Sequence, residues 1–153
     1  MNSKGHFNVP IGGYENPKIL DEGNLRNVSK YIERVEFHHS DYKGAKDYLS
    51  NGTLVYFDPP YRPLTTSSSF TAYAKSGFND ENQVELADFC RILHKQSVSF
   101  MLSNSDPKNA DATDDFFDML YKEFKIERVD ANRAINSKSS GRGKISEILV
   151  RNY

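Results

Sequence analysis

The sequence predicts an α/β fold, in which short buried strands alternate with amphipathic helices. Leu54–Phe57 and Val98–Leu102 are apolar runs of strand length, and polar residues follow each of them. Between these runs, residues 80–95 carry apolar side chains at helical spacing. Strands that alternate with a helix in this way are typical of a sheet covered by helices.

The size and composition of the chain fit one globular domain. It has 153 residues, of which 37% are hydrophobic and 27% charged, and its net charge is −1. No apolar run approaches the roughly 20 residues of a membrane-spanning helix, and no signal peptide is visible at Met1. The single cysteine, Cys90, excludes an internal disulfide and a cysteine cluster for metal. We therefore expect a cytoplasmic protein with no membrane partner.

The first third of the chain predicts an irregular start followed by short elements. Gly, Pro and Asn interrupt residues 1–18, although aromatic and aliphatic side chains there require contacts. Asp21 is expected to cap a helix that runs to about Glu33. Val35–His38 is expected to form a short strand, and Asp41 to cap a helix that ends near Leu49.

The segment Tyr56–Tyr61, with the sequence YFDPPY, is the candidate catalytic segment. Two consecutive prolines stop a strand, because each ring removes a backbone donor. The chain therefore leaves the sheet at Asp58, at the end where open α/β sheets bind their ligands. One carboxylate, two proline carbonyls and the Tyr61 ring suit a planar base that bears an amino group. The alternative is a strand end that two prolines stop, with no catalytic role.

The second half of the chain predicts a long loop, two helices and three strands. The loop covers residues 62–79 and has the length of a binding loop. A helix follows from Asn79 or Asp80 to about Lys95, and a second helix is expected over 113–123. Strands are expected over 98–102, 126–129 and 147–150. The residues expected to face inward from the first helix are Val84, Ala87, Cys90 and Leu93.

Charged residues are unevenly distributed. Residues 131–153 contain five basic side chains against one acidic side chain, Glu147, and such a segment could bind phosphate. An ordinary solvated surface is the alternative. The four histidines have no metal-ligand spacing, so we predict no metal site.

Several motifs together resemble the Dam-type (D12 class) site-specific DNA adenine N6-methyltransferases. Residues 4–14 look like that family's K-G-x-F-N-V-P-x-G-x-Y run, and Phe70–Tyr73 looks like its F-T-x-Y loop. Ser103-Asn104 matches a strand exit, and residues 133–149 look like the C-terminal hairpin. DPPY alone occurs in other amino-methylating enzymes, but FNVP, DPPY and FTAY in this order are specific. The resemblance covers nearly the entire chain.

The resemblance implies a Rossmann-like methyltransferase fold, of which this chain is the C-terminal part: a mixed sheet flanked by helices, with an antiparallel terminal hairpin. Residues 1–20 would end the DNA target-recognition region, and residues 21–153 would belong to the catalytic domain. The family's glycine-rich F-x-G-x-G motif, which embraces the methionine part of S-adenosylmethionine, is absent. The chain therefore looks like an expressed fragment, one product of a split gene, or a remnant.

The resemblance also implies roles for single residues. The catalytic set would be Asp58, Pro59, Pro60 and Tyr61, with direct methyl transfer and no metal. Asp41, Tyr42 and Asp58 would lie beside S-adenosylmethionine, although Asp41 has the alternative role of a helix cap. The residues that would contact DNA are Asn8, Pro10, Tyr14, Phe70, Tyr73, Arg133, Lys138 and Arg142. For Tyr14 the alternative is to cover the core, and for Phe70 and Tyr73 it is to pack their own loop.

The leading functional hypothesis is a DNA adenine methyltransferase that acts on duplex DNA in a bacterial or phage-like cytoplasm. A non-catalytic DNA-binding or assembly module is the main alternative. Enzymes that methylate cytosine or a protein glutamine are disfavoured by the aspartate at position 58 and by the FNVP run. The resemblance further implies an open edge at Leu54–Phe57, because two strands of the family's N-terminal half would lie beside it. A moved strand 35–38, a second copy, or a separate N-terminal half with the glycine-rich motif would cover this edge.

Overall fold

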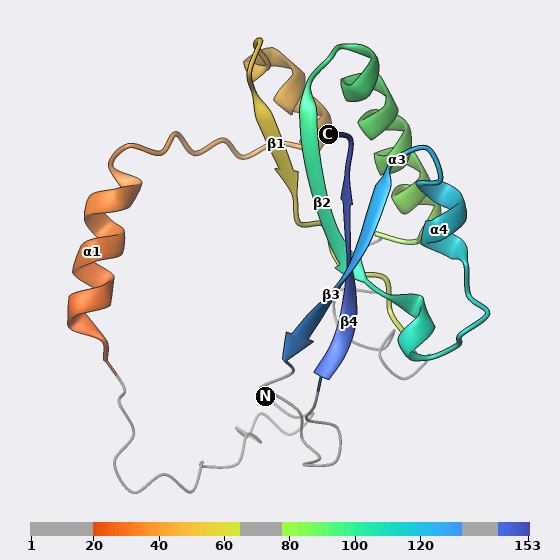
Figure 1. The fold of residues 1–153 in the computed structure, drawn as a ribbon. Helices are drawn as coiled ribbons and strands as arrows, with labels where there is room; N and C mark the ends of the chain where they lie inside the picture. Colours follow the sequence, from red (N-terminus) through yellow and green to blue (C-terminus); the bar gives the residue numbers. More distant parts are fainter. Residues whose placement is uncertain (1–19, 65–77, 133–143) are drawn as a thin grey trace, which may run out of the picture. The chain divides into compact units, whose positions relative to one another are not determined.

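The computed structural model describes residues 20–64, 78–132 and 144–153, and the chain divides into two compact units, residues 1–40 and 41–153 (Figure 1). The second unit contains all four strands of the described residues. In the part of the chain that is described, no helix has both the length and the apolar character needed to cross a membrane.

A mixed four-stranded sheet organises residues 41–153 (Figure 1). Its strands are β1 (Leu54–Phe57), β2 (Ser99–Ser105), β3 (Lys125–Asn132) and β4 (Lys144–Arg151), in the spatial order β1-β2-β4-β3. β1 and β2 are parallel, whereas β4 is antiparallel to both of its neighbours. The predicted mixed sheet with an antiparallel terminal hairpin is confirmed.

Helix α3 (Asp80–Lys95) packs its inner face on this sheet. Asn79 begins the helix through a capping box, since its side chain accepts from the backbone of Asn82 and the Asn82 side chain accepts in return. The predicted inward position of Val84 is wrong: its side chain is 41% exposed. Val84 lies about 100° around the helix from the buried Gln83, which carries it away from the sheet.

The hydrophobic core lies between α3, the strands and the segment after β2. Cys90 is fully buried there, and burial raises the pKa of its thiol to about 12. Aromatic rings meet edge to face across the core, with the ring centroids of Phe100 and Phe124 5.0 Å apart. The buried apolar residues are Phe57, Leu86, Ala87, Phe89, Cys90, Leu93, Val98, Phe100, Leu102, Phe117, Tyr121, Ile148 and Val150.

Several predicted boundaries in the second half differ from those observed. β3 and β4 are both longer than the strands predicted over 126–129 and 147–150, since the two pair with each other along their whole length. β2 continues beyond Leu102 to Ser105, because β4 pairs with the polar strand end as far as Ser105 opposite Glu147. The helix expected over 113–123 is shorter, and α4 spans Phe116–Leu120 after the 3₁₀ turn η3 (Pro107–Asn109). Aspartate side chains at positions 111 and 114 accept bonds from the backbone two residues later, which holds the preceding segment in turns.

The elements before β1 follow the predicted caps but not the predicted strand. Helix α1 (Glu22–Ile32) begins where Asp21 accepts from the Asn24 N–H at 3.1 Å. Asp41 likewise accepts from the Lys43 N–H, but the element that follows, η1 (Tyr42–Tyr48), is a 3₁₀ helix. Val35–His38 is not a strand, because among the described residues no neighbouring strand pairs with it.

Truncation of Leu102 should test the core. Leu102 is fully buried in the central strand β2, so Leu102→Ala should lower the free energy of unfolding by about 2–5 kcal/mol. The matched control is Met119→Ala, at a side chain that is 64% exposed, where the expected change is below about 0.5 kcal/mol. Urea denaturation, monitored by circular dichroism, measures both changes. Equal decreases in the free energy of unfolding of the two variants would contradict the core assignment.

Candidate active site at the carboxyl ends of β1 and β2

The two polar strand exits meet at one edge of the sheet. Because β1 and β2 are parallel and Phe57 pairs with Leu102, the next residues of the two strands, Asp58 and Ser103, are neighbours. The Ser103 hydroxyl donates to Asp58 Oδ1 at 3.4 Å and accepts from the Tyr56 hydroxyl at 2.9 Å. The structure therefore places the predicted catalytic carboxylate beside a hydroxyl from the neighbouring strand.

A cavity of about 300 Å³ opens beside Asp58. Its walls are mainly aromatic and apolar, and its one charged residue is Asp58. Tyr42, from η1, and Asp58 both line this cavity. The resemblance implied that these two residues lie beside the cofactor. The lining residues are Tyr42, Tyr56, Phe57, Asp58, Pro59, Pro60, Phe78 and Leu86. A flat ring that carries an amino group suits such a space.

Tyr42 and Asp41 differ in what they contribute. The Tyr42 ring packs edge to face on Phe89, with ring centroids 5.4 Å apart. Its hydroxyl is buried with no partner among the described residues, and burial raises its pKa. Asp41 does not line the cavity; the structure shows its carboxylate as the cap of η1. Its predicted place beside the cofactor stays a prediction.

Tyr61 lies outside the cavity lining and is 38% exposed. Its hydroxyl lies 3.5 Å from Glu147 Oε2 on β4. Partial burial raises the pKa of this hydroxyl, and a hydrogen bond with Ser103 opposes the shift. The Tyr61 ring is therefore held next to the Asp58–Ser103 pair, while its stacking on a base stays a prediction.

The segment after the two prolines is held by side chains that sequence reasoning missed. Gln83 Nε2 donates to the Pro60 carbonyl at 3.1 Å, and the Arg62 N–H donates to Asn104 Oδ1 at 3.0 Å. The Arg62 guanidinium pairs with Asp80 and Asp114. A detectable signal existed for Gln83: it is a polar residue on the apolar stripe of a helix, at the spacing of Ala87 and Cys90.

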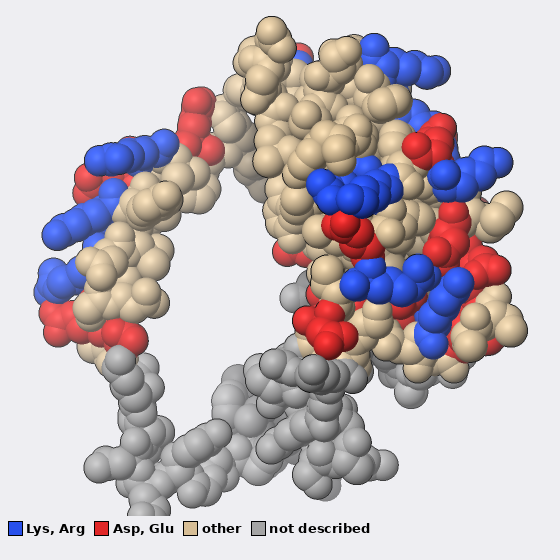
Figure 2. Space-filling view, viewed as in Figure 1, with Lys and Arg blue, Asp and Glu red and all other residues tan. Residues whose placement is uncertain are grey.

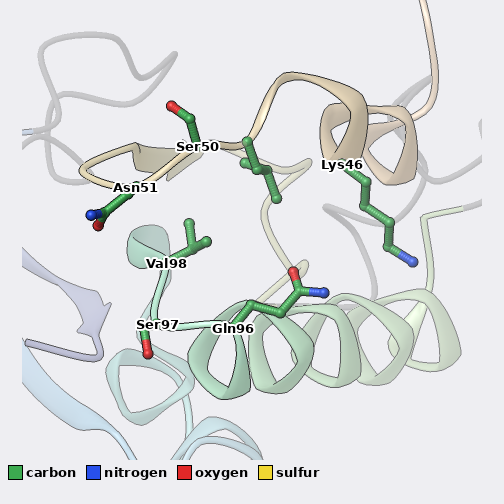
Figure 3. Close-up of a pocket in the computed structure, with 7 residues that line it drawn as sticks. Lys46, Ser50, Asn51, Gln96, Ser97 and Val98 are labelled. Carbon is green, nitrogen blue, oxygen red and sulfur yellow. The ribbon is translucent and has the colours of Figure 1, made fainter.

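A second cavity, of about 370 Å³, lies at the opposite ends of β1 and β2 (Figure 3). Lys46 is its one charged residue, and the polar side chains that Figure 3 labels point in different directions rather than toward a common point. The convergence of a carboxylate, a hydroxyl and aromatic walls at Asp58 makes the first cavity the candidate active site.

Many charged side chains of the described residues form ion pairs. Figure 2 shows basic and acidic side chains intermixed on the face of residues 41–153 that it presents. Lys108 contacts Asp115 at 2.7 Å, and Arg128 contacts Asp106 at 3.0 Å and Asp118 at 2.8 Å. No metal-binding group of His, Cys, Asp and Glu occurs within residues 20–64, 78–132 and 144–153. The predicted DNA contacts lie outside these ranges: Asn8, Pro10, Tyr14, Phe70, Tyr73, Arg133, Lys138 and Arg142.

An α/β sheet with an aspartate and two prolines at a strand exit is the architecture that the sequence motifs implied. The family model of the D12 class N6 adenine-specific DNA methyltransferases matches residues 1–135, and the chain belongs to this family.

Similar proteins agree with this assignment. The chain is 47% identical to the Type II methyltransferase M.MjaIII of Methanocaldococcus jannaschii, over the whole chain and 51% of that protein. It is 43% identical to the Type II methyltransferase M1.LlaDCHI of Lactococcus lactis subsp. cremoris, over the whole chain and 52% of that protein. The DNA adenine methylase of Escherichia coli (strain K12) is 30% identical over 97% of this chain and 51% of its own length. The chain thus spans about half the length of these relatives.

Proposed function

We propose that the chain is the part of a site-specific DNA adenine N6-methyltransferase that carries the catalytic segment. The complete enzyme would transfer a methyl group from S-adenosylmethionine to an adenine flipped out of duplex DNA. The observation that carries this proposal is the Asp58 carboxylate at a Pro-Pro strand exit, facing a cavity with aromatic walls. Family membership supports it.

The chemistry assigned to the chain is that of two acceptors at fixed positions. The adenine amino nitrogen is a poor nucleophile, because its lone pair is delocalised into the ring. The Asp58 carboxylate and the Pro59 carbonyl would each accept one amino hydrogen, which favours a pyramidal nitrogen with its lone pair free to attack. Such positioning and electrostatics would supply the catalysis, without a covalent enzyme intermediate.

The residues present fit part of the cofactor. S-adenosylmethionine supplies an electrophilic methyl group on a sulfonium. The cavity beside Asp58 is at the small end of the range for ligand sites, and its walls of Tyr42, Tyr56 and Phe78 suit a purine ring. Tyr42, Asp58 and, by resemblance, Asp41 would hold the nucleoside part. The glycine-rich motif that would hold the methionine part is absent from this sequence.

The open edge of β1 supports a partner for this chain. β1 pairs with β2 on one side, and among the described residues no strand pairs with its other side. Two apolar side chains of this edge strand, Leu54 and Tyr56, are 56% and 58% exposed. Apolar edge strands are normally paired or covered. We infer that a segment carrying the glycine-rich motif covers β1 in the active enzyme, and that self-association covers it when that segment is absent.

The remaining assignments follow from the same proposal. Residues 1–20 would end the target-recognition region and residues 21–153 would belong to the catalytic domain, in an enzyme of restriction-modification systems that works in the cytoplasm. The alternative of a non-catalytic DNA-binding or assembly module is less favoured, because the matching family model and the similar proteins are those of DNA adenine methyltransferases.

Asp58→Ala in the complete enzyme should lower turnover to below about one-hundredth of the wild-type value, because an acceptor for the amino hydrogens is removed. DNA binding should stay near the wild-type level. Methyl incorporation and a DNA mobility-shift assay measure the two effects. The control is Asp47→Ala, at an exposed carboxylate on η1 away from the cavity. Wild-type turnover in Asp58→Ala would refute the catalytic assignment.

Neutral replacements of Arg133, Lys138 and Arg142 should weaken binding to specific and unrelated DNA sequences equally. The slope of log K against log salt should become shallower by about one unit for each phosphate that the protein no longer neutralises. Binding titrations at several salt concentrations, with specific and unrelated duplexes, measure this slope. An unchanged slope would mean that the basic segment is only a solvated surface.

The chain by itself should bind S-adenosylmethionine negligibly and should have no methyltransferase activity, because the motif for the methionine part is missing. Addition of a separate segment with the glycine-rich motif should restore binding. Titration calorimetry measures the affinity, and light scattering reports self-association. Micromolar binding of the cofactor by a monomer would contradict the proposal of a missing half.

A further inference from the structure

Two fully buried amide side chains lie behind the candidate catalytic segment. Gln83 belongs to α3 and Asn104 to β2, and Asn104 Nδ2 donates to Gln83 Oε1 at 3.2 Å. Burial of an amide is unfavourable unless its hydrogen bonds are made, and apolar side chains of similar shape could fill the same space. The pair therefore requires an explanation beyond packing.

Both amides hold the backbone that follows the two prolines. Gln83 Nε2 donates to the Pro60 carbonyl at 3.1 Å. Asn104 Oδ1 accepts the Arg62 N–H at 3.0 Å and the Ser105 N–H at 2.9 Å. The Ser105 hydroxyl donates to the Arg62 carbonyl at 2.7 Å. Three backbone polar groups between Pro60 and Arg62 thus have side-chain partners from α3 and β2.

This segment depends on such partners for its position. Pro59 and Pro60 have no N–H, and residues 58–63 belong to no helix or strand, so no ladder of backbone bonds fixes them. The Asp58 carboxylate and the Pro59 carbonyl lie directly before the held groups. A displacement of about 1 Å in reacting groups can cost about 100-fold in rate.

We propose that Gln83 and Asn104 are positioning residues for methyl transfer: by fixing the backbone from Pro60 to Arg62, they set the position of the Asp58 carboxylate and the Pro59 carbonyl. This inference rests on the proposed function. Neither amide lines the cavity, so each acts through the backbone that it holds. Ser105 contributes to the same positioning, because its hydroxyl donates to the Arg62 carbonyl.

The kinetic test uses the chain assembled with the segment that carries the glycine-rich motif. Gln83→Met keeps the length of the side chain and removes its donor to Pro60. We expect kcat to fall by about 10- to 100-fold, with KM for S-adenosylmethionine and for DNA within about twofold of wild type. The matched control, Gln96→Met, changes the exposed glutamine at the end of the same helix and should leave kcat unchanged.

A second variant covers the case in which Gln83→Met does not fold. Ser105→Ala removes one hydroxyl and its bond to the Arg62 carbonyl, and we expect kcat to fall about 10-fold with KM unchanged. Wild-type kcat in a folded Gln83→Met would overturn the inference, and where Gln83→Met does not fold, wild-type kcat in Ser105→Ala would overturn it. A rise in KM with unchanged kcat would also overturn it, because it would indicate a binding role.

Amide hydrogen exchange on the chain by itself separates this inference from the proposed function. The Arg62 amide should exchange at least about tenfold faster in Gln83→Met than in wild type or Gln96→Met, because the Gln83–Asn104 pair that holds it is broken. Unchanged exchange would overturn the positioning role even if the enzyme methylates DNA. A wild-type assembly that methylates no adenine would overturn the proposed function, and with it the catalytic role of the amides.

Discussion

The parallel pairing of β1 with β2 is the constraint on which the rest of the site depends. Its register puts Phe57 opposite Leu102 and so brings Asp58 and Ser103 out of the sheet side by side. An antiparallel pairing would put the two strand exits at opposite edges, and the carboxylate would lose its neighbouring hydroxyl. On its other side β2 pairs antiparallel with β4, and this pairing extends β2 to Ser105. Asn104 and Ser105, at the end of β2, therefore lie where they hydrogen-bond the backbone of Arg62, after Asp58.

Local signals predicted much of the fold. The apolar run of β1, its two prolines and the cap at Asp21 all act within a few residues, and each lies where the sequence placed it. The sequence left the start of α3 open between Asn79 and Asp80, and Asn79 is the cap. The prediction of a strand over Val35–His38 is wrong for a physical reason. A strand forms only when it pairs with another strand, and no strand of the described residues pairs with this segment. The sequence did not predict the polar end of β2, because its residues have the composition of a loop. Pairing with β4 makes them part of the strand.

The sequence predicted which side chains form the candidate site, but not which residues hold them in position. The sequence placed Asp58 at a strand exit and Tyr42 near it, and the cavity brings both together. It did not indicate which side chains hold the segment, because Gln83 and Pro60 are far apart along the chain. It also left the two roles of Asp41 open, and the cap is the one for which the structure gives a contact.

The deep burial of Cys90 has a practical consequence. The sequence contains one cysteine, and this thiol lies in the core with a pKa far above neutral pH. Thiolate is the reactive form, so an alkylating reagent reacts with the chain mainly when the core opens. The rate of labelling therefore reports the opening of the core directly, even in a mixture with DNA or other proteins that lack thiols. The molecule thus contains its own reporter of conformational stability, at a position where no label has to be introduced.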